Sequence, residues 1–353
     1  MIPARDADGW SRELGISREA VELYLASEVV DLHLDSFIWK RLFGYDLARR
    51  HARPPLAGWF LGHADFPRVR EAGVASATWV ITTNPLRDAP DRTRTLFDNL
   101  TELKRQFAAL SEELCFTRTH AEYVAARHAG KHAAFIGIQG GNALDGSADA
   151  VERLAPLDVL RVTLVHLSNS SIGQTSSPLR AGADGGLSRF GRELVERLEH
   201  ARIFVDLAHI SRRGFWDAVE VHDRTLPLLV THTGVSSVHR HWRNLDDSQI
   251  RAIAASGGVI GIMYHSAFLG PSLARGRAEW VVDHIEHVVR LVGEDYVALG
   301  SDFDGAIVPP RNLTSILELP RLVELMLGRG FGSDVIRKVL GQNFLRVLAQ
   351  VRP

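Results

Sequence analysis

The sequence predicts an α/β fold, a (β/α)8 barrel of the TIM type, from two features of the chain. Short runs rich in β-branched residues recur along it about eight times. Most of them are continuous rather than alternating, which is typical of parallel strands buried on both faces. Segments with the apolar period of a helix lie between them. This alternation favours a barrel, with a doubly wound sheet as the alternative.

The predicted elements follow one another without a break in composition. The strands are Val29–Leu34, Val74–Thr82, Ala134–Ile138, Val159–His166, Ile203–Ala208, Leu226–Thr231, Gly258–Tyr264 and Tyr296–Gly300. The clearest helices are Thr93–Leu110, Arg189–Glu199, Asp246–Ala255 and Val281–Leu291. We expect one barrel domain over residues 1–353, with residues 1–28 as an extra N-terminal helical segment.

The composition excludes several classes of protein. The chain is 45% hydrophobic and 24% charged, with a net charge of −1, so no basic field points to nucleic acid or an acidic membrane surface. Its single cysteine, Cys115, rules out an intrachain disulfide. The N-terminus lacks the pattern of a signal peptide, and no apolar run approaches the ~20 residues that span a bilayer. We therefore expect a cytoplasmic globular protein without nucleic-acid or membrane partners.

Polar side chains follow the predicted strands at the point where each strand ends. They are His33, Asp35, Gln139, His166, His209, His232, Asp302 and Asp304. In a barrel the carboxyl ends of all strands open at one mouth, where barrel enzymes hold their active sites. Histidines and carboxylates that converge there form a ligand set of the zinc type. A single histidine at a strand end is more often structural, so the prediction rests on the coincidence of several.

An ordered set of motifs resembles the membrane (renal) dipeptidase family, peptidase family M19 of the amidohydrolase superfamily. The resemblance runs from about Val29 to the C-terminus. It is carried by DLHLDS, GIQGGNAL, LRVTLVHLSNS, GGLSRFGRELVERL, FVDLAHIS, THTG, HWRNLDDSQIRAIAASGGVIGI, YVALGSDFDG and IRKVLGQNFLRVL. It implies a metal-dependent barrel of the amidohydrolase type.

The resemblance also implies the ligands of two zinc ions. One ion would take His33 and Asp35, and the other would take His209 and His232. A glutamate at the position of Gln139 normally bridges the two ions in this family.

The roles of four further residues follow from the same resemblance. Asp302 would exchange a proton with the attacking water, and His166 would polarise the scissile carbonyl. Arg243 would bind the terminal carboxylate of the substrate, with Asn169 as a second substrate-binding residue. The implied reaction is hydrolysis of a small-molecule dipeptide, often with a D-residue on its C-terminal side. Dimers are common in the family, so a homodimer is compatible with the resemblance.

Gln139 departs from the family pattern. A carboxylate gives one oxygen to each of two cations and cancels charge between them, whereas an amide offers one neutral oxygen. We therefore expect a weakened or absent second metal site. Three hypotheses remain: a hydrolase with one metal held by His33, Asp35, His209 and Asp302; an enzyme for another amide or lactam, or with a non-hydrolytic reaction; and an inactive homologue that binds a small ligand.

Overall fold

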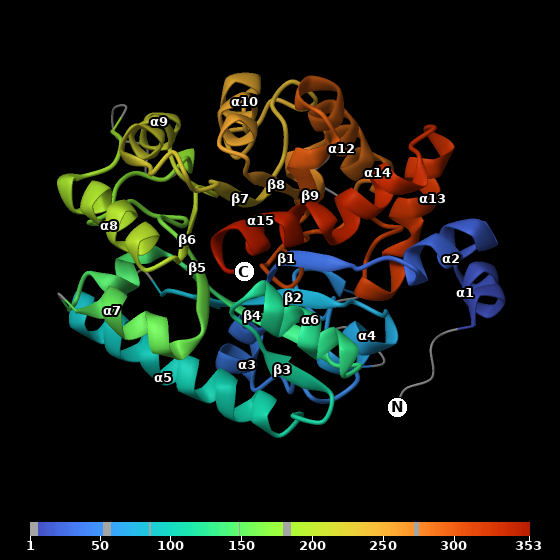
Figure 1. Cartoon of the computed structure of the whole chain (residues 1–353), viewed down its shortest axis with the longest axis horizontal. Coiled ribbons are helices and arrows are strands. Elements are labelled where there is room, and N and C mark those ends of the chain that lie inside the picture. Colours follow the sequence, from blue (N-terminus) through green and yellow to red (C-terminus); the bar gives the residue numbers. More distant parts are fainter. Residues whose placement is uncertain (1–5, 52–57, 85, 148, 179–184, 272–274) are drawn as a thin grey trace.

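The centre of the molecule is a closed barrel of parallel strands wrapped by helices (Figure 1). The structure, a computed structural model, describes residues 6–51, 58–84, 86–147, 149–178, 185–271 and 275–353. Neighbouring strands pair in parallel around the sheet, and the pairing of β2 with β4 closes it. The predicted (β/α)8 barrel is confirmed.

Eight of the nine described strands form the barrel, in the order β1, β2, β4, β5, β6, β7, β8, β9 and back to β1. The strands are β1 Val30–Leu34, β2 Ser76–Thr82, β3 Leu114–Phe116, β4 His132–Gln139, β5 Val159–Thr163, β6 Phe204–Asp206, β7 Leu229–Thr233, β8 Val259–Ile262 and β9 Val297–Leu299. The extra strand β3 pairs only with the first residues of β4. β5 pairs further along β4, where the barrel continues.

The helices cover the outside of the barrel and one of its ends. Before and between the strands lie α1 Ala7–Leu14, α2 Arg18–Leu25, α3 Phe37–Phe43, α4 Phe66–Glu71, α5 Ala89–Ala108, α6 His120–His128, α7 Ala150–Leu154, α8 Arg189–His200, α9 Arg212–Val221, α10 Asp247–Ala255, α11 Ser266–Leu269 and α12 Ala278–Val292. After β9 come α13 Pro320–Gly328, α14 Ser333–Arg337 and α15 Asn343–Val351. None of the helices described combines the length and the apolar character that crossing a bilayer requires.

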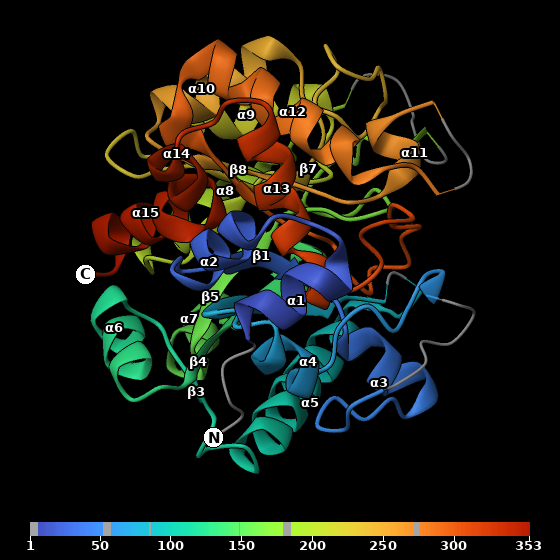
Figure 2. The same cartoon turned by 90° about the vertical axis from the view of Figure 1, so that its right-hand side faces the viewer.

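The N-terminal helices α1 and α2 lie outside the barrel beside α13 (Figures 1 and 2). Trp10 of α1 is buried against Tyr24 of α2, with ring centroids 5.6 Å apart. The indole of Trp10 donates to the carbonyl of Leu317, and the hydroxyl of Tyr24 donates to the carbonyl of Ala72. The extra N-terminal helical segment is thus present, while the limits of the domain remain a prediction.

A separate apolar core closes the end of the barrel where the strands begin. It joins Val30, Phe204 and Leu229, each at the start of its strand, to Phe344 and Leu348 of α15. Most side chains at the strand starts are apolar and buried, and the polar exceptions Ser76 and His132 are buried and hydrogen-bonded to the carbonyls of Ala133 and Val74. The opposite end, where the strands finish, is therefore the end that holds polar side chains.

One strand begins later than predicted, one ends earlier, and one was not predicted. β7 begins at Leu229 rather than Leu226, because Pro227 has no N–H to donate to a ladder. β5 ends at Thr163, three residues before His166, so this histidine lies on the following loop. β3 was not predicted, because three residues are too few to show a period.

Candidate metal centre

The strand-end side chains singled out by the sequence meet at the carboxyl end of the barrel. We call seven of them the mouth cluster: His33, Asp35, Gln139, His166, His209, His232 and Asp302. Each lies within the last residues of its strand or within three residues after it. They are linked by an unbroken series of contacts, so the predicted convergence is what the structure shows.

The tightest group in the cluster combines β1, β7 and the loop after β9. One potential ligand atom from each of His33, His232 and Asp302 lies within 4.8 Å of the other two. Nε2 of His33 is 3.6 Å from Oδ1 of Asp302, and the rings of His33 and His232 are 3.8 Å apart at their centroids. This group takes one histidine from each of the two ligand pairs that the resemblance assigns to separate ions.

His209 and His166 extend the group along the mouth. Nε2 of His209 is 2.8 Å from Nε2 of His232, and its ring centroid is 4.7 Å from that of His166. His209 has a φ of +65° and Asp302 one of +58°. Left-handed backbone is costly for residues other than glycine and persists where the surrounding structure enforces it, as at functional sites. Both side chains are thus turned into the mouth by unusual backbone.

Gln139 lies between Asp35 and His166. Its amide Nε2 is 3.4 Å from Oδ2 of Asp35 and 3.1 Å from Nε2 of His166. An ionised carboxylate only accepts hydrogen bonds, so the NH2 side of the amide faces Asp35. Oε1 of Gln139 is buried without a hydrogen-bond partner among the described residues.

Burial in the cluster keeps the imidazoles neutral and raises the pKa values of the carboxylates. Burial, followed by nearby cationic groups, lowers the pKa of His33, His209 and His232 well below the ordinary value. Burial raises the pKa of Asp35 to about 6 and, together with Asp35, raises that of Asp302 well above its usual range. A divalent cation would relieve both effects, because it needs neutral imidazoles and offsets crowded carboxylates.

The donor atoms of the cluster fit such a cation. Nε2 of His33, Oε1 of Gln139 and Nδ1 of His209 are buried with no hydrogen-bond partner among the residues described. Buried polar atoms are rarely left unpaired, and a ligand is one explanation for them. Imidazole nitrogens with carboxylate oxygens are the donors of zinc and related transition metals.

Comparison with known proteins settles the family. A family model for the membrane dipeptidases (peptidase family M19) matches residues 17–353. The chain belongs to this family. Membership implies a divalent metal ion, in agreement with the donor set at the mouth.

Individual relatives show how far the likeness reaches. Dipeptidase tcpJ of Claviceps purpurea (strain 20.1) is 28% identical over 298 residues, which are 82% of this chain and 69% of that protein. A Klebsiella pneumoniae protein described as an uncharacterized protein in the pqqA 5' region is 38% identical over 172 residues, 47% of this chain. That match spans 61% of the Klebsiella protein.

Solved structures show the same fold over most of the chain. Dipeptidase AC, a metallopeptidase of family M19, is 26% identical with a TM-score of 0.81, covering 92% of this chain and 98% of its own. An amidohydrolase from Pseudomonas aeruginosa is 25% identical with a TM-score of 0.77, covering 94% of this chain and 98% of its own.

Beneath the cluster of this M19 chain lies a buried network that the sequence did not reveal. The Arg161 guanidinium donates to Asp206 at 3.1 Å and to Nδ1 of His33 at 2.8 Å. Gly137 makes room for it, since a Cβ there would lie 3.0 Å from Cζ of Arg161. The only hint in the sequence is one arginine inside a β-branched run.

The same network sets which nitrogen of each histidine carries a proton. The hydroxyl of Thr231 donates to Asp206 at 2.7 Å, so it accepts from Nδ1–H of His232 at 3.0 Å. The lone pair of His232 Nε2 therefore points into the mouth, where it now faces Nε2 of His209 at 2.8 Å and where a bound metal could take it. His33 differs, because Arg161 always donates to its Nδ1. Neutral His33 then carries its proton on Nε2, which a cation at that atom would displace.

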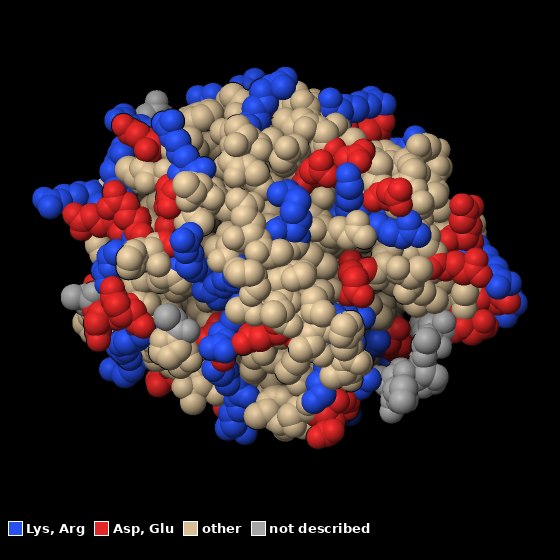
Figure 3. Space-filling model, in the orientation of Figure 1, with Lys and Arg blue, Asp and Glu red and all other residues tan. Residues whose placement is uncertain are grey.

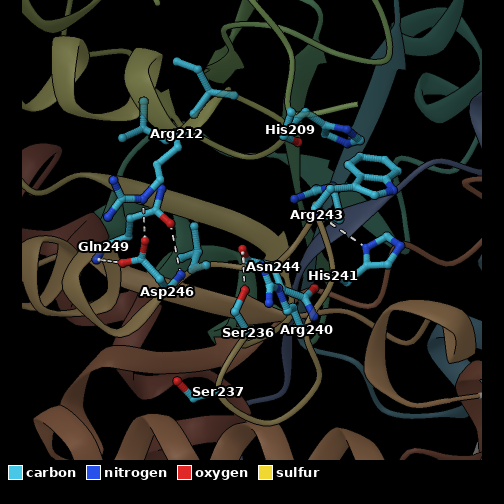
Figure 4. A pocket seen from close by; sticks show the side chains of 15 residues that line it. His209, Arg212, Ser236, Ser237, Arg240, His241, Arg243, Asn244, Asp246 and Gln249 are labelled. Carbon is cyan, nitrogen blue, oxygen red and sulfur yellow. Dashed lines mark hydrogen bonds and ion pairs between the residues drawn. The ribbon is translucent and has the colours of Figure 1, made fainter. Parts of the chain in front are cut away.

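Arg243 is the predicted substrate-binding residue that lies closest to the cluster. Its side chain is buried, and Nη2 donates to the carbonyl of His232 at 2.6 Å. Nε has no hydrogen-bond partner among the described residues. Figure 4 shows Arg243 beside His209 at the wall of a pocket. The pKa of Arg243 is lowered by burial to about 10, so the guanidinium stays charged at neutral pH.

Asn169, the other residue assigned to substrate binding, lies on the exposed loop after β5. Its Oδ1 accepts from the backbone N–H of Thr175, whose hydroxyl donates to the carbonyl of His209. The described contacts therefore connect Asn169 to the cluster through Thr175.

Asp304 anchors the backbone that carries Asp302. Its carboxylate accepts from the backbone N–H groups of His63 and Ala64 and from the hydroxyl of Ser36. These contacts tie the loop after β9 to the loops that follow β1. The sequence suggested Asp304 as a candidate at the strand end, and the structure places it one layer behind Asp302.

Proposed function

We propose that this chain is a metal-dependent hydrolase of dipeptides or closely related small amides. The observation that carries the proposal is the convergence of neutral imidazoles, carboxylates and unpaired buried donor atoms at one mouth of the barrel. Membership of the M19 family and a dipeptidase among the relatives support the same reaction.

The proposed ligands are His33, Asp35, His209, His232 and the amide oxygen of Gln139. When bound, a divalent ion such as zinc would supply Lewis acidity that lowers the pKa of a bound water far below its bulk value, toward about 7. We expect nearer one ion than two. Gln139 turns an N–H group toward Asp35, on the side where a bridging carboxylate would present oxygen.

Without a bridging carboxylate, the repulsion between two divalent ions is large enough to weaken binding of the second ion. Two-metal sites hold their ions about 4 Å apart. At an effective dielectric constant of about 20, each pair of unit charges at that separation is worth about 4 kcal/mol. The neutral amide of Gln139 offsets none of the repulsion between two divalent ions. His33 and His232, which the resemblance assigns to different ions, offer ligand atoms within 4.8 Å of each other, and this closeness also suits a single ion.

The remaining residues act on the substrate. Oδ1 of Asp302 accepts the proton of the attacking water and returns it to the leaving amine. Because the amide of Gln139 donates to Nε2 of His166, this histidine holds its proton on Nδ1. The Nδ1–H group of His166 stabilises the negative charge that develops on the substrate carbonyl. The guanidinium of Arg243 binds the terminal carboxylate, with a planar fork that lysine lacks. Asn169 supports the substrate from the loop after β5.

The deciding experiment combines metal analysis with a dipeptide panel. Protein dialysed against metal-free buffer and reloaded with zinc should carry about one ion per chain and hydrolyse some dipeptides with free C-termini. Chelation should abolish the activity, and added zinc should restore it. Metal binding without hydrolysis of any dipeptide would instead favour another amide substrate. A chain that binds no divalent metal would refute the proposal.

A further inference from the structure

A pocket of about 810 Å³ adjoins the mouth cluster, shares His209 with it and is also lined by Arg243. Its walls come from the loops after β6 and β7 and from the first residues of α9 and α10. Figure 4 shows His209 and Arg243 along one side, and Arg212 with Asp246 on the other. The pocket thus extends away from the proposed reaction centre, beyond the guanidinium of Arg243.

The charges in this pocket are not balanced. Arg212, Arg240 and Arg243 line it together with a single carboxylate, Asp246. That carboxylate is already engaged: Oδ2 accepts from Arg212 at 2.8 Å, and Oδ1 accepts from the backbone N–H of Gln249 at 3.0 Å. Arg240 is exposed and has no ion-pair partner among the residues described. The charges left over are therefore cationic.

The local backbone adds to this positive potential. α9 begins at Arg212 and spans 10 residues, and Arg212 lines the pocket. The N-terminus of a helix carries a partial positive charge. The histidine in the lining does not change the balance, because burial lowers the pKa of His241 to about 4 and leaves it neutral at neutral pH. An anion is the only charged ligand that these walls favour.

We propose that this pocket binds the acidic side chain of the substrate's C-terminal residue, so that the preferred substrates are dipeptides ending in aspartate or glutamate. The proposal rests on the dipeptidase function above. Arg243, buried beside the cluster, takes the α-carboxylate, and Arg240, three positions earlier on the same loop, takes the side-chain carboxylate. A basic side chain finds no free carboxylate here, and a small apolar one leaves Arg240 without a partner.

The test compares isosteric substrates on the zinc-loaded protein. Dipeptides that end in Glu or Gln, and in Asp or Asn, are assayed with the same N-terminal residue and in both configurations of the C-terminal one. We expect the acidic member to have a kcat/KM about tenfold higher, through a charge-assisted hydrogen bond at a partly exposed site. The ratio should shrink as salt rises, because exposed charges are screened.

Variants of Arg240 test whether the preference for an acidic C-terminal residue arises in this pocket. Arg240→Gln should bring the Glu-to-Gln ratio close to one, and Arg240→Glu should invert the preference in favour of C-terminal lysine. Arg224→Gln is the matched control: it removes the same charge from an exposed arginine between α9 and β7, at the other end of the barrel. Its ratio should equal that of the unaltered protein.

A binding measurement separates this inference from the dipeptidase proposal. Calorimetry with free glutamate and free glutamine requires no turnover, and glutamate should bind more tightly in a manner that depends on Arg240. If that holds while no dipeptide is cleaved, the pocket is as inferred and the dipeptidase proposal is wrong. If Glu and Gln dipeptides are cleaved equally, or if the preference survives in Arg240→Gln, the pocket inference is wrong and the dipeptidase proposal stands.

Discussion

Gln139 offers the most direct test at the scale of a single residue. Replacing it with glutamate adds an oxygen donor and a negative charge beside Asp35, where the amide now presents N–H. Because a carboxylate offsets repulsion between two divalent cations, Gln139→Glu should raise the metal content from about one ion per chain toward two. Elemental analysis after dialysis measures this content.

A second variant controls for added charge alone. Asn84→Asp introduces a carboxylate on the loop after β2, near the mouth but outside the cluster. It should leave the metal content unchanged. Two ions in the unaltered protein at full occupancy would contradict the one-metal proposal and show that another ligand bridges them.

The residues that touch the mouth were accessible to sequence reasoning, and the residues behind them were not. His33, His209 and His232 stand at strand ends, where topology alone predicts their convergence. Arg161 lies inside β5 and Asp206 is the last residue of β6, and a charged residue in a strand can equally face solvent. Their buried pairing, with 1% exposure for Arg161 and 0% for Asp206, depends on the open space above Gly137. That space becomes visible only once the barrel has closed.

At the scale of elements, long amphipathic helices were predicted more accurately than short strands. α8, Arg189–His200, matches the predicted Arg189–Glu199 closely, because Ser188 caps it and its apolar face is continuous. α5 begins at Ala89 rather than Thr93, since Asp88 caps the first turn and Pro90 is tolerated there. β3 depends on its pairing partner, which a local pattern does not report, whereas Pro227 is a local signal that the predicted start at Leu226 did not take into account.

The helix α15 yields a prediction about stability. Phe344 is buried at the closed end of the barrel, with its ring centroid 5.8 Å from that of Phe135 and 6.4 Å from that of Phe204. Phe344→Ala leaves a cavity among strand-start side chains and should lower the free energy of unfolding by about 3–5 kcal/mol. Urea denaturation measures this change.

The control lies on the same helix. Gln350 is exposed, so Gln350→Ala should change the free energy of unfolding by less than about 0.5 kcal/mol. Because the mouth lies at the other end of the barrel, metal content should be unaffected in both variants. A folded Phe344→Ala protein that has lost its metal would show that the two ends are coupled.

At the scale of the whole molecule, the apolar closing core and the candidate metal site lie at opposite ends of the barrel. Apolar side chains and α15 close the end where the strands begin, and the mouth cluster occupies the end where they finish. Figure 3 shows acidic and basic side chains interspersed over one face of the surface, in keeping with a net charge of −1. The expected cytoplasmic location and homodimer remain predictions.

Two buried histidines outside the cluster make the stability of the whole fold depend on pH. Burial lowers the pKa of His132 and of His284 to about 4. Each ring must be neutral, because one of its nitrogens accepts a hydrogen bond: Nε2 of His132 from the indole of Trp79, and Nδ1 of His284 from the backbone N–H of Val235. Protonation of either ring in the folded state would break that bond.

Acid should therefore remove the stability that these two neutral histidines contribute. A histidine in the unfolded chain has a pKa of about 6.5, so below that pH the unfolded state binds more protons than the folded state. The stability from each histidine is complete above pH ~6.5 and falls by about 1.4 kcal/mol per unit as pH drops toward 4. Histidines of the mouth cluster add a loss of the same sign.

His284→Gln isolates one contribution, because its amide can accept from Val235 and donate to the carbonyl of Leu269 as the imidazole does. Urea denaturation of the metal-free protein between pH ~7 and ~5 should give a shallower loss of stability in His284→Gln than in the unaltered chain. Parallel losses in the two proteins would show that His284 does not titrate between its folded and unfolded states.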